Sequence, residues 1–452
     1  MAYKKSLFIF RRDLRIFDNT ALLQACRNSR KVIVGFVFDP DLLARSHNGP
    51  SYRTGFLLDS LRDLNRQVRA CGGELSFFHG EPVEVIARMV TDEGIDAVYI
   101  NRDYTPLARR RDERIRRLCR QRDVAFVSCE DALLNPPEAV SRADGNPYQV
   151  FTPWFNVAKK LSVPAPDESM PDNLLTRRIG DSWTAARKPR AMQGDFSGGR
   201  RAALELLSRA GSLKNYGDER DIPAVEGTSR LAAHLRFGTI SMREARHHLV
   251  KLLGEEHELI RQLYWRDFWY HIAWHFPHVF GGAFRRRYDQ IPWIDDDLRF
   301  ESWCEGKTGF PLVDAGMREL VATGYMHNRV RMVTASFLVK NLHIDWRRGE
   351  AFFARHLIDY DPAVNNGNWQ WAASTGCDAQ PWFRVFNPWR QQRRFDPEGE
   401  YIRRWVHELA DRSPAAIHRL ERDPTGYISP VVDLQLSAEE IKAKFRSLSP
   451  SA

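Results

Sequence analysis

Residues 359–375 read DYDPAVNNGNWQWAAST and bring together two aspartates, three asparagines and two tryptophans. The segment holds no metal-ligand or nucleophile pattern. Carboxamides beside indoles suit a flat heterocycle, because an amide donates and accepts hydrogen bonds in one plane. Trp369 and Trp371 stand two residues apart, so on a helix or a strand their side chains diverge, one inward and one outward. The residues alone leave two interpretations open: a ligand-binding segment, or a buried turn that fixes the start of a helix.

The sequence on both sides of this segment has the pattern of helices. Ser241-Met-Arg-Glu244 is a capping box, the helical pattern of residues 257–276 stops at Pro277, and that of residues 311–323 stops at Gly324. We therefore expect an all-helical, all-α domain over residues 200–445. A chain of 452 residues with 43% hydrophobic residues exceeds what one core usually organises, so we expect at least one further domain.

Residues 1–134 alternate between short apolar runs and segments of helix length. The runs are Leu7–Phe10, Val32–Phe38, Leu75–Phe78, Ala97–Ile100 and Ala125–Val127. This alternation predicts an α/β domain, a doubly wound parallel sheet with helices on both faces. The usual dinucleotide fingerprint, G-x-G-x-x-G after the first run, is missing.

Residues 135–199 are rich in proline and are predicted to form a linker between the two domains. We expect this linker to be ordered, because four apolar side chains in it can dock on a core. They are Val150, Phe151, Trp154 and Phe155.

Polar residues follow the first and fourth apolar runs, where ligands of such sheets bind. They form the segments Arg11–Arg15 and Asn101–Pro106. For Arg11–Arg15 we favour a salt-bridged turn over a catalytic role. The arginines of residues 109–122 invite a nucleic-acid interpretation, but an apolar stripe with Ile115 at its centre places them on the solvated back of a helix.

The composition favours a polyanionic partner such as nucleic acid. Lys and Arg number 67 against 58 Asp and Glu, which gives a net charge of +9 and a pI near 9.3. The 6 cysteines form no C-x-x-C pair, so neither a disulfide framework nor a structural metal site is expected. No apolar run reaches the length of a membrane span and no secretion signal is visible. We therefore expect a monomer in the cytoplasm.

Three groups of residues on the helical part are candidate binding sites. Tyr216 with Gly227-Thr-Ser-Arg-Leu231 places hydroxyls and backbone N–H groups at a helix start, which suits an anion, although simple N-capping by Thr228 or Ser229 explains the same residues. A second group shares one helix face by its spacing, as binding residues or as a tryptophan-rich core stripe: Gln262, Trp265, Arg266 and Trp269. A third follows the same spacing: Asn328, Arg331 and Met332.

The segment 359–375, together with Met326-His-Asn-Arg-Val-Arg-Met332, resembles the flavin-binding half of the DNA photolyase and cryptochrome family. The resemblance runs from about residue 6 to 440, with its most specific part between Gly306 and Pro388. It implies that the helical domain binds FAD. The residues implied to hold FAD are Tyr216, Thr228, Ser229, Arg230, Leu231, Arg331, Asp359, Asp361 and Asn365, with Arg331 paired to Asp359 and Asn365 facing flavin N5.

The family also binds a light-harvesting antenna pigment in its α/β domain. The segment Asn101–Asp112 is more similar to members that carry 8-hydroxy-5-deazaflavin than to those with methenyltetrahydrofolate. A flavin nucleotide, or no pigment, stays open.

The resemblance assigns further side chains to UV-damaged DNA and to electron transfer. Trp265 and Trp371 are implied to stack on a flipped-out pyrimidine dimer, with Gln262, Asn328 and Met332 beside it. Candidate phosphate contacts are Arg220, Arg266, Arg329 and Arg394. The chain of tryptophans that carries electrons from the surface to the flavin is implied to be Trp293, Trp346 and Trp369.

These assignments imply light-driven repair of cyclobutane pyrimidine dimers by an electron from reduced FAD. Gln262 departs from the glutamate usual in that class and is what members acting on (6-4) photoproducts carry, but the single His327 followed by Asn328 favours the cyclobutane lesion. The alternatives are a (6-4) photolyase and a cryptochrome photosensor, although we see no signalling extension after the helical pattern of residues 438–448. A basic helical DNA-binding module without flavin is a further alternative.

Overall fold

The computed structural model describes residues 2–40, 51–186, 188, 192, 194 and 196–448. The chain forms two compact units. The sheet unit comprises Met1–Pro147, Thr152–Ser212 and Ser229–Trp274, and the helical unit comprises Tyr148–Phe151, Leu213–Thr228 and His275–Ala452. These units do not follow the expected boundaries after residues 134 and 199, because the helices up to Trp274 cluster with the sheet. The expected division into residues 1–134, 135–199 and 200–445 stays a prediction.

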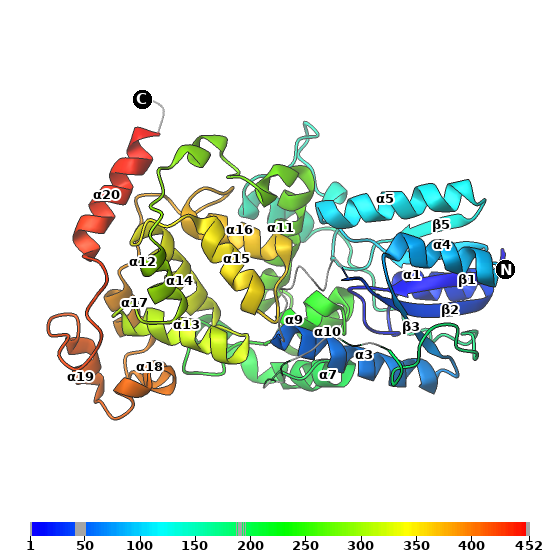
Figure 1. The fold of residues 1–452 in the computed structure, drawn as a ribbon, viewed down its shortest axis with the longest axis horizontal. Coiled ribbons are helices and arrows are strands. Elements are labelled where there is room, and N and C mark those ends of the chain that lie inside the picture. Colours follow the sequence, from blue (N-terminus) through cyan, green and yellow to red (C-terminus); the bar gives the residue numbers. More distant parts are fainter. Residues whose placement is uncertain are drawn as a thin grey trace. The chain divides into compact units, whose positions relative to one another are not determined.

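The sheet unit is built on five parallel strands in the order β3-β2-β1-β4-β5. Their bounds are β1 Tyr3–Phe10, β2 Ser29–Phe38, β3 Leu75–His79, β4 Ala97–Asn101 and β5 Ala125–Cys129. Helices α1 Thr20–Asn28, α3 Tyr52–Ala70, α4 Pro82–Glu93 and α5 Pro106–Gln121 connect them (Figure 1). The predicted doubly wound α/β sheet is confirmed. Its order reverses at β1, so the ends of β1 and β4 meet at the edge where such sheets bind ligands.

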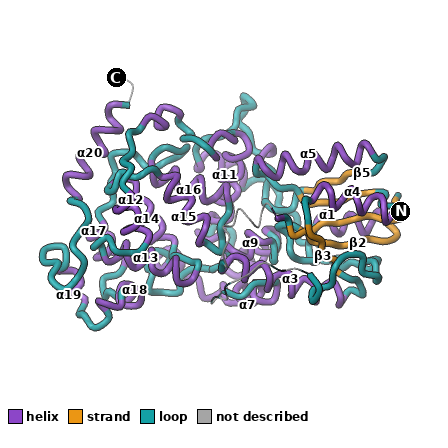
Figure 2. The backbone as a smooth tube through the Cα atoms, viewed as in Figure 1, coloured by secondary structure: helices purple, strands orange, loops and turns teal. Residues whose placement is uncertain are grey.

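Strands β1 to β4 are largely buried on both faces, as parallel sheets covered by helices are, whereas the edge strand β5 is mostly half-buried. Figure 2 shows them as a single layer with helices alongside. Leu7, Ile33 and Val98 from three neighbouring strands pack with side chains of α4 and α5 in one apolar cluster. This burial explains why the sequence shows continuous apolar runs here instead of alternation.

The remaining helices of the sheet unit cover residues that we assigned to the linker and the helical domain. They are α6 Phe151–Ala158 (all but its first residue), α7 Arg200–Ser208, α9 Ala232–Phe237, α10 Met242–Leu253 and α11 Glu258–His275, with a 3₁₀ helix at Pro137–Ala139. The capping box is confirmed at α10, where the Ser241 hydroxyl accepts the N–H of Glu244 at 2.9 Å. Trp154 is buried against Tyr264 of α11, so this part of the linker is ordered as expected. Val150 was expected to dock on a core, which is wrong: it is 45% exposed, since α6 (Phe151–Ala158) begins only after it.

The helical unit confirms the expected all-α domain. Its α-helices are α8 Tyr216–Glu219, α12 Asp297–Cys304, α13 Pro311–Thr323, α14 Asn328–Lys340, α15 Trp346–His356, α16 Pro362–Ala373, α17 Pro388–Phe395, α18 Glu400–Trp405, α19 Pro414–Arg419 and α20 Leu434–Ser447. Short 3₁₀ helices lie at Arg209–Asn215, Pro277–Phe280, Arg286–Gln290 and His407–Leu409. One apolar core, formed largely by α13–α16, holds the unit together. Within the described residues, every helix is too short or too polar to cross a lipid bilayer.

The segment 359–375 forms α16 and its two ends. Asp361 caps the helix by accepting the N–H of Ala363 at 3.1 Å, and Pro362 occupies the first turn, where its missing N–H costs nothing. Ser374 ends the helix in the left-handed conformation, with φ +61°. Trp369 is buried and Trp371 is half-buried, so the two indoles diverge as predicted.

Candidate functional site

A charged pair joins α14 to the turn before α16. The Arg331 guanidinium donates to both carboxylate oxygens of Asp359, at 3.2 and 3.0 Å, and its Nε donates to the main-chain oxygen of Met326 at 2.7 Å. The geometry is bidentate, which makes the pair strong and fixes its orientation. Although burial alone lowers the pKa of Arg331, the Asp359 carboxylate raises it above its ordinary value. The predicted Arg331–Asp359 pair is therefore confirmed.

Asn365 lies on the first turns of α16, on the same helix as the half-buried Trp371. Its side chain is buried, and its Nδ2 donates to the main-chain oxygen of Glu350 on α15 at 3.3 Å. The other two asparagines make bonds of the same kind. Asn366 donates to the main-chain oxygen of Val279 at 2.9 Å, and Asn368 donates to that of Val364 at 2.8 Å. All three asparagines of the segment thus use their amide nitrogen within the protein.

Glu350 is a half-buried acid that the sequence analysis missed. Burial raises its pKa to about 7, against hydrogen bonds from Asn366 and Asn365 that lower it. The signal was present in the sequence: Glu350 follows Trp346 by four residues, so the two share a face of α15. A carboxyl that is partly protonated at neutral pH therefore lies next to Asn365.

We expect Glu350→Gln to change how the stability depends on pH. The pKa of Glu350 is higher in the folded protein than the 4.5 expected of the unfolded chain, so the folded state holds the proton more tightly. The free energy of unfolding then falls as pH rises from about 4.5 through 7, by roughly 2–3 kcal/mol for this group. Glutamine mimics the protonated acid, so the variant gains stability over wild type at pH 8 and little at pH 5, measured by urea unfolding at both values.

The exposed Glu398 provides the control for this experiment, because Glu398→Gln removes an acid of the same unit without a buried environment. An equal shift in both variants, or a Glu350→Gln gain that is the same at pH 5 and pH 8, contradicts the prediction.

The three predicted electron-transfer tryptophans lie in the helical unit and differ in burial. Trp369 on α16 and Trp346 at the start of α15 are buried, whereas Trp293 is half-buried. The Arg347 guanidinium lies 4.9 Å from the centre of the Trp346 ring. This order, from two buried indoles to a half-buried one, is what a path from the interior to the surface requires, and the path itself stays a prediction.

The predicted anion segment is divided between the two units, and each part is described by itself. In the helical unit Tyr216 is buried at the start of α8, with the Arg220 guanidinium 5.6 Å from its ring centre. In the sheet unit Arg230 has φ +51° and α9 begins directly after Leu231. The N-cap of α9 is Leu231, without a side-chain hydrogen bond. The alternative that Thr228 or Ser229 caps this helix is therefore wrong, because the helix starts later than the capping pattern implied.

Helix α11 of the sheet unit carries Gln262, Trp265 and Arg266. Gln262 and Trp265 are half-buried, and the Trp265 ring lies against the buried ring of Trp269 with centroids 5.5 Å apart. Asp267 anchors the helix by accepting the N–H groups of Leu134 and Asn135 at 2.8 and 3.1 Å. Burial raises the pKa of Asp267 to about 7.

Two of the four candidate phosphate contacts are engaged inside the protein. Arg266 donates to the main-chain oxygen of Ala132 at 2.7 Å, within the sheet unit. Arg329 pairs with Asp221 at 2.6 Å, within the helical unit. Arg220 is half-buried and Arg394 is exposed. The structure therefore leaves Arg394 as the candidate best placed to meet solvent.

Asn328 and Met332 lie one turn apart on α14, as their spacing predicted. The Asn328 amide lies 3.8 Å from the Met332 sulfur. Asn328 is exposed and Met332 is half-buried, so both are accessible from the first turn of the helix.

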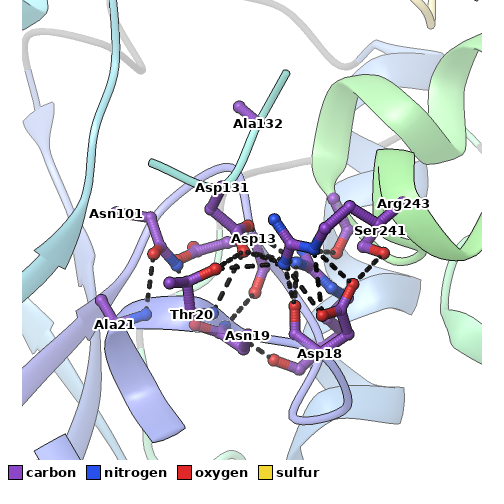
Figure 3. Close-up of polar contacts among 12 residues, drawn as sticks. Asp13, Asp18, Asn19, Thr20, Ala21, Asn101, Asp131, Ala132, Ser241 and Arg243 are labelled. Carbon is purple, nitrogen blue, oxygen red and sulfur yellow. Dashed lines mark hydrogen bonds and ion pairs between the residues drawn. The ribbon is translucent and has the colours of Figure 1, made fainter. Parts of the chain in front are cut away.

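The polar rim of the sheet is paired within itself (Figure 3). Arg15 donates to both oxygens of the buried Asp131, at 2.8 and 2.7 Å, and Arg243 of α10 bridges Asp131 and Asp18. The Asn101 amide donates to Asp13 at 2.6 Å. The expected salt-bridged turn at residues 11–15 is confirmed.

A small cavity adjoins this rim, lined by Arg11, Asp103 and their neighbours. It encloses only about 10 Å³, which is room for about one water molecule. Arg11 pairs with Asp112 on α5 and Arg12 pairs with Asp103 at 3.3 Å. The arginines at the end of β1 are thus paired with carboxylates of α5 and of the segment after β4.

Each unit, taken by itself, carries groups that suit part of FAD. A diphosphate needs cations, hydroxyls and N–H groups, and an isoalloxazine ring needs in-plane partners beside flat hydrophobic surface. Residues 229–231 of the sheet unit offer groups of the first kind, and the half-buried Arg331–Asp359 pair with Asn365 in the helical unit offers groups of the second kind. A doubly wound sheet unit together with such a helical unit is the architecture of the photolyase and cryptochrome class of flavoproteins.

Comparison with known proteins agrees with this class. A family model for the FAD binding domain of DNA photolyase matches residues 259–447, and one for DNA photolyase matches residues 6–171. The deoxyribodipyrimidine photo-lyase of Synechococcus sp. is 35% identical over 98% of this chain and 96% of its own length. That of Escherichia coli is 36% identical over 90% of each chain. An archaeal photolyase structure from Sulfolobus tokodaii has a TM-score of 0.89 at 42% identity, covering 98% of this chain and 100% of its own. The chain belongs to the DNA photolyase family.

Proposed function

We propose that this photolyase uses light to repair cyclobutane pyrimidine dimers in DNA, as a deoxyribodipyrimidine photo-lyase. The observation that carries the proposal is the arrangement of indoles on two helices. On α11 the buried Trp269 supports the half-buried Trp265, and on α16 the half-buried Trp371 follows the buried Trp369. Each helix therefore keeps one aromatic face available for stacking. Near-full-length relatives named deoxyribodipyrimidine photo-lyase support the same activity.

The side chains of the pocket bind and orient; none acts as an acid, base or nucleophile. FAD, when bound and reduced, supplies the electron that splits the dimer and takes it back afterwards. Extruding a damaged base pair costs a few kcal/mol, and stacking on Trp265 and Trp371 returns about 1–3 kcal/mol per base. The Gln262 amide both donates and accepts, so it can pair with the carbonyl and the N–H of a thymine.

We expect Asp359→Asn to weaken FAD retention. The substitution leaves the partly buried Arg331 guanidinium without its anionic partner, and breaking a buried pair in this way costs roughly 3–5 kcal/mol. The purified variant should therefore carry much less flavin per protein, measured from the blue absorption band of oxidised flavin against protein concentration.

Glu408→Gln is the matched control for this prediction. It breaks the Arg318–Glu408 pair of 2.6 Å in the same unit, at residues without a predicted FAD role. If Asp359→Asn retains as much flavin as the wild type, the Arg331–Asp359 pair does not contribute to FAD binding.

The proposed electron supply runs through the helical unit. Trp369 gives an electron toward the flavin pocket, Trp346 refills Trp369, and Trp293 refills Trp346. A reductant in solution then restores the half-buried Trp293, which balances the electron count. Trp369 and Trp346 are buried and Trp293 is half-buried, which supports this direction.

The antenna proposal rests on the segment 101–112, which favours 8-hydroxy-5-deazaflavin over methenyltetrahydrofolate. Because the rim groups are paired with one another, a pigment would bind beside them and not among them. The Sulfolobus tokodaii structure holds two FAD molecules and implies a novel light-harvesting cofactor, so a second flavin is the rival outcome. Chromatography of the pigments released by denaturing the purified protein distinguishes 8-hydroxy-5-deazaflavin, methenyltetrahydrofolate and a second flavin.

Repair of two defined lesions tests the proposed function. The reduced, illuminated protein should restore thymines from a cyclobutane dimer in an oligonucleotide and leave a (6-4) photoproduct unchanged. Repair of the (6-4) lesion alone would place this protein among the (6-4) photolyases, which carry glutamine at the position of Gln262. Repair of neither lesion would favour a cryptochrome-type photosensor. A cryptochrome structure from Synechocystis sp. is 28% identical to this chain, with a TM-score of 0.86. We expect the active form to be a monomer that acts in the cytoplasm.

A further inference from the structure

Gly349 lies in the middle of α15 and against the ring of Trp369. A Cβ at this position would be 2.2 Å from Cη2 and 2.6 Å from Cζ3 of that indole, and 2.5 Å from a methyl group of Leu338. Real Cβ atoms essentially never approach closer than 3.0 Å. Glycine is unfavourable inside a helix compared with alanine, so this position gives up helix stability to make room for the ring.

The other sides of the Trp369 ring are closed by aromatic groups. The Phe353 ring meets it edge-on with centroids 4.9 Å apart, and the Trp303 ring does so at 6.2 Å. Trp303 and Phe353 are themselves stacked, 12° from parallel. Interiors are close-packed, so the indole cannot give way on one side without displacing these neighbours. Trp369 is 2% exposed, and its position is fixed by contacts on all of these sides.

Helix α15 carries both Gly349, which leaves room for the Trp369 ring, and Trp346, which is the next tryptophan of the proposed path. Trp346 begins the helix three residues earlier and Phe353 follows four residues later, so the three positions share one face. Electron transfer slows steeply as the distance between donor and acceptor grows. One rigid helix therefore sets where Trp369 lies relative to Trp346.

We propose that Gly349 is a positioning residue for light-driven reduction of the flavin, because its missing side chain lets Trp369 rest against the main chain of α15. This inference rests on the electron path proposed above. The distance of 2.2 Å must open to the ordinary 3.4 Å or more when a methyl group is added, so Gly349→Ala displaces the ring by about 1 Å.

The test measures three quantities in FAD-loaded Gly349→Ala. Light-driven reduction of bound flavin should slow by a few-fold, since the rate of electron transfer falls with each ångström added between donor and acceptor. Dimer repair by protein that was first reduced with dithionite should keep its rate, which a general collapse of the unit would not allow. Gly281→Ala is the control, because no atom lies within 4 Å of the Cβ that it would add.

A double-variant cycle keeps the proposal testable if Gly349→Ala folds poorly. Phenylalanine lacks the Cη2 and Cζ3 atoms, so Gly349→Ala should lower Tm by roughly 5 °C when residue 369 is tryptophan and by much less in Trp369→Phe. Equal losses in both backgrounds overturn the proposal. So does wild-type photoreduction in Gly349→Ala while Trp369→Phe is slow. If Trp369→Phe alone reduces flavin at the wild-type rate, the proposed electron path is wrong, and the positioning role of Gly349 is wrong as well.

Discussion

Trp369→Phe will slow light-driven reduction of bound FAD by on the order of a hundredfold or more, because the proposed path then loses the tryptophan that passes the electron to the flavin. A phenyl ring is much harder to oxidise than an indole, so the buried Trp346 would have to reach the flavin directly. The measurement is the loss of the blue flavin band under continuous illumination with a thiol reductant. Repair by protein reduced beforehand with dithionite, assayed in parallel, separates a missing electron supply from a damaged pocket.

Trp389→Phe is the appropriate control for this experiment. Trp389 is buried in the same apolar core, so the substitution removes an indole of the same size without touching the proposed path. Rapid photoreduction in Trp369→Phe, or an equal slowing in Trp389→Phe, would show that electrons reach the flavin by another route.

Trp265→Ala will weaken binding of DNA that contains a cyclobutane dimer by about 1–3 kcal/mol, which is roughly a 5- to 150-fold rise in Kd. Stacking on the half-buried indole is available only to bases that have left the duplex, so binding of undamaged DNA should change little. The measurement is a filter-binding or anisotropy titration with two oligonucleotides that differ only in the lesion, in the dark and at one salt concentration.

Trp183→Ala controls for the general loss of a half-buried indole from the sheet unit. Trp183 lies under the Lys188 ammonium at 4.1 Å and near Arg62, in a segment without a predicted DNA role. An equal loss of affinity for damaged and undamaged DNA in Trp265→Ala would mean that this indole contributes to general DNA binding and does not stack on the lesion. That result would leave the stacking role to Trp371 or remove it altogether.

The local signals in the sequence predicted the elements well because they are short-range. Pro277 and Gly324 ended the predicted helices at or within one residue of the observed ends, and Ser241 caps α10 as its motif requires. Each of these signals depends on φ, on a missing N–H or on a hydroxyl within one turn. The exception at α9 follows the same logic, since Thr228 and Ser229 precede the helix by too many residues to cap it.

The division into units was harder to predict because it depends on long-range packing. The sequence changes from strand-like to helical patterns near residue 200, yet α7, α9, α10 and α11 cluster with the sheet. Phe237 of α9, for example, accepts the N–H of Leu14 at 3.1 Å, far away in the sequence. A change of secondary structure is visible in a window of residues, whereas a contact over this separation is not.

The sequence by itself determined the parallel sheet, the helices around DYDPAVNNGNWQWAAST and, through their spacing, the side chains that share a face. It also indicated the Arg331–Asp359 pair through resemblance. Only the tertiary structure showed that the three asparagines bond to the main chain, that the half-buried Glu350 lies beside Asn365, and that Gly349 lies against Trp369. The reason is that burial and contact depend on which helices pack together. The positions of two residues in the sequence do not show whether their helices are in contact.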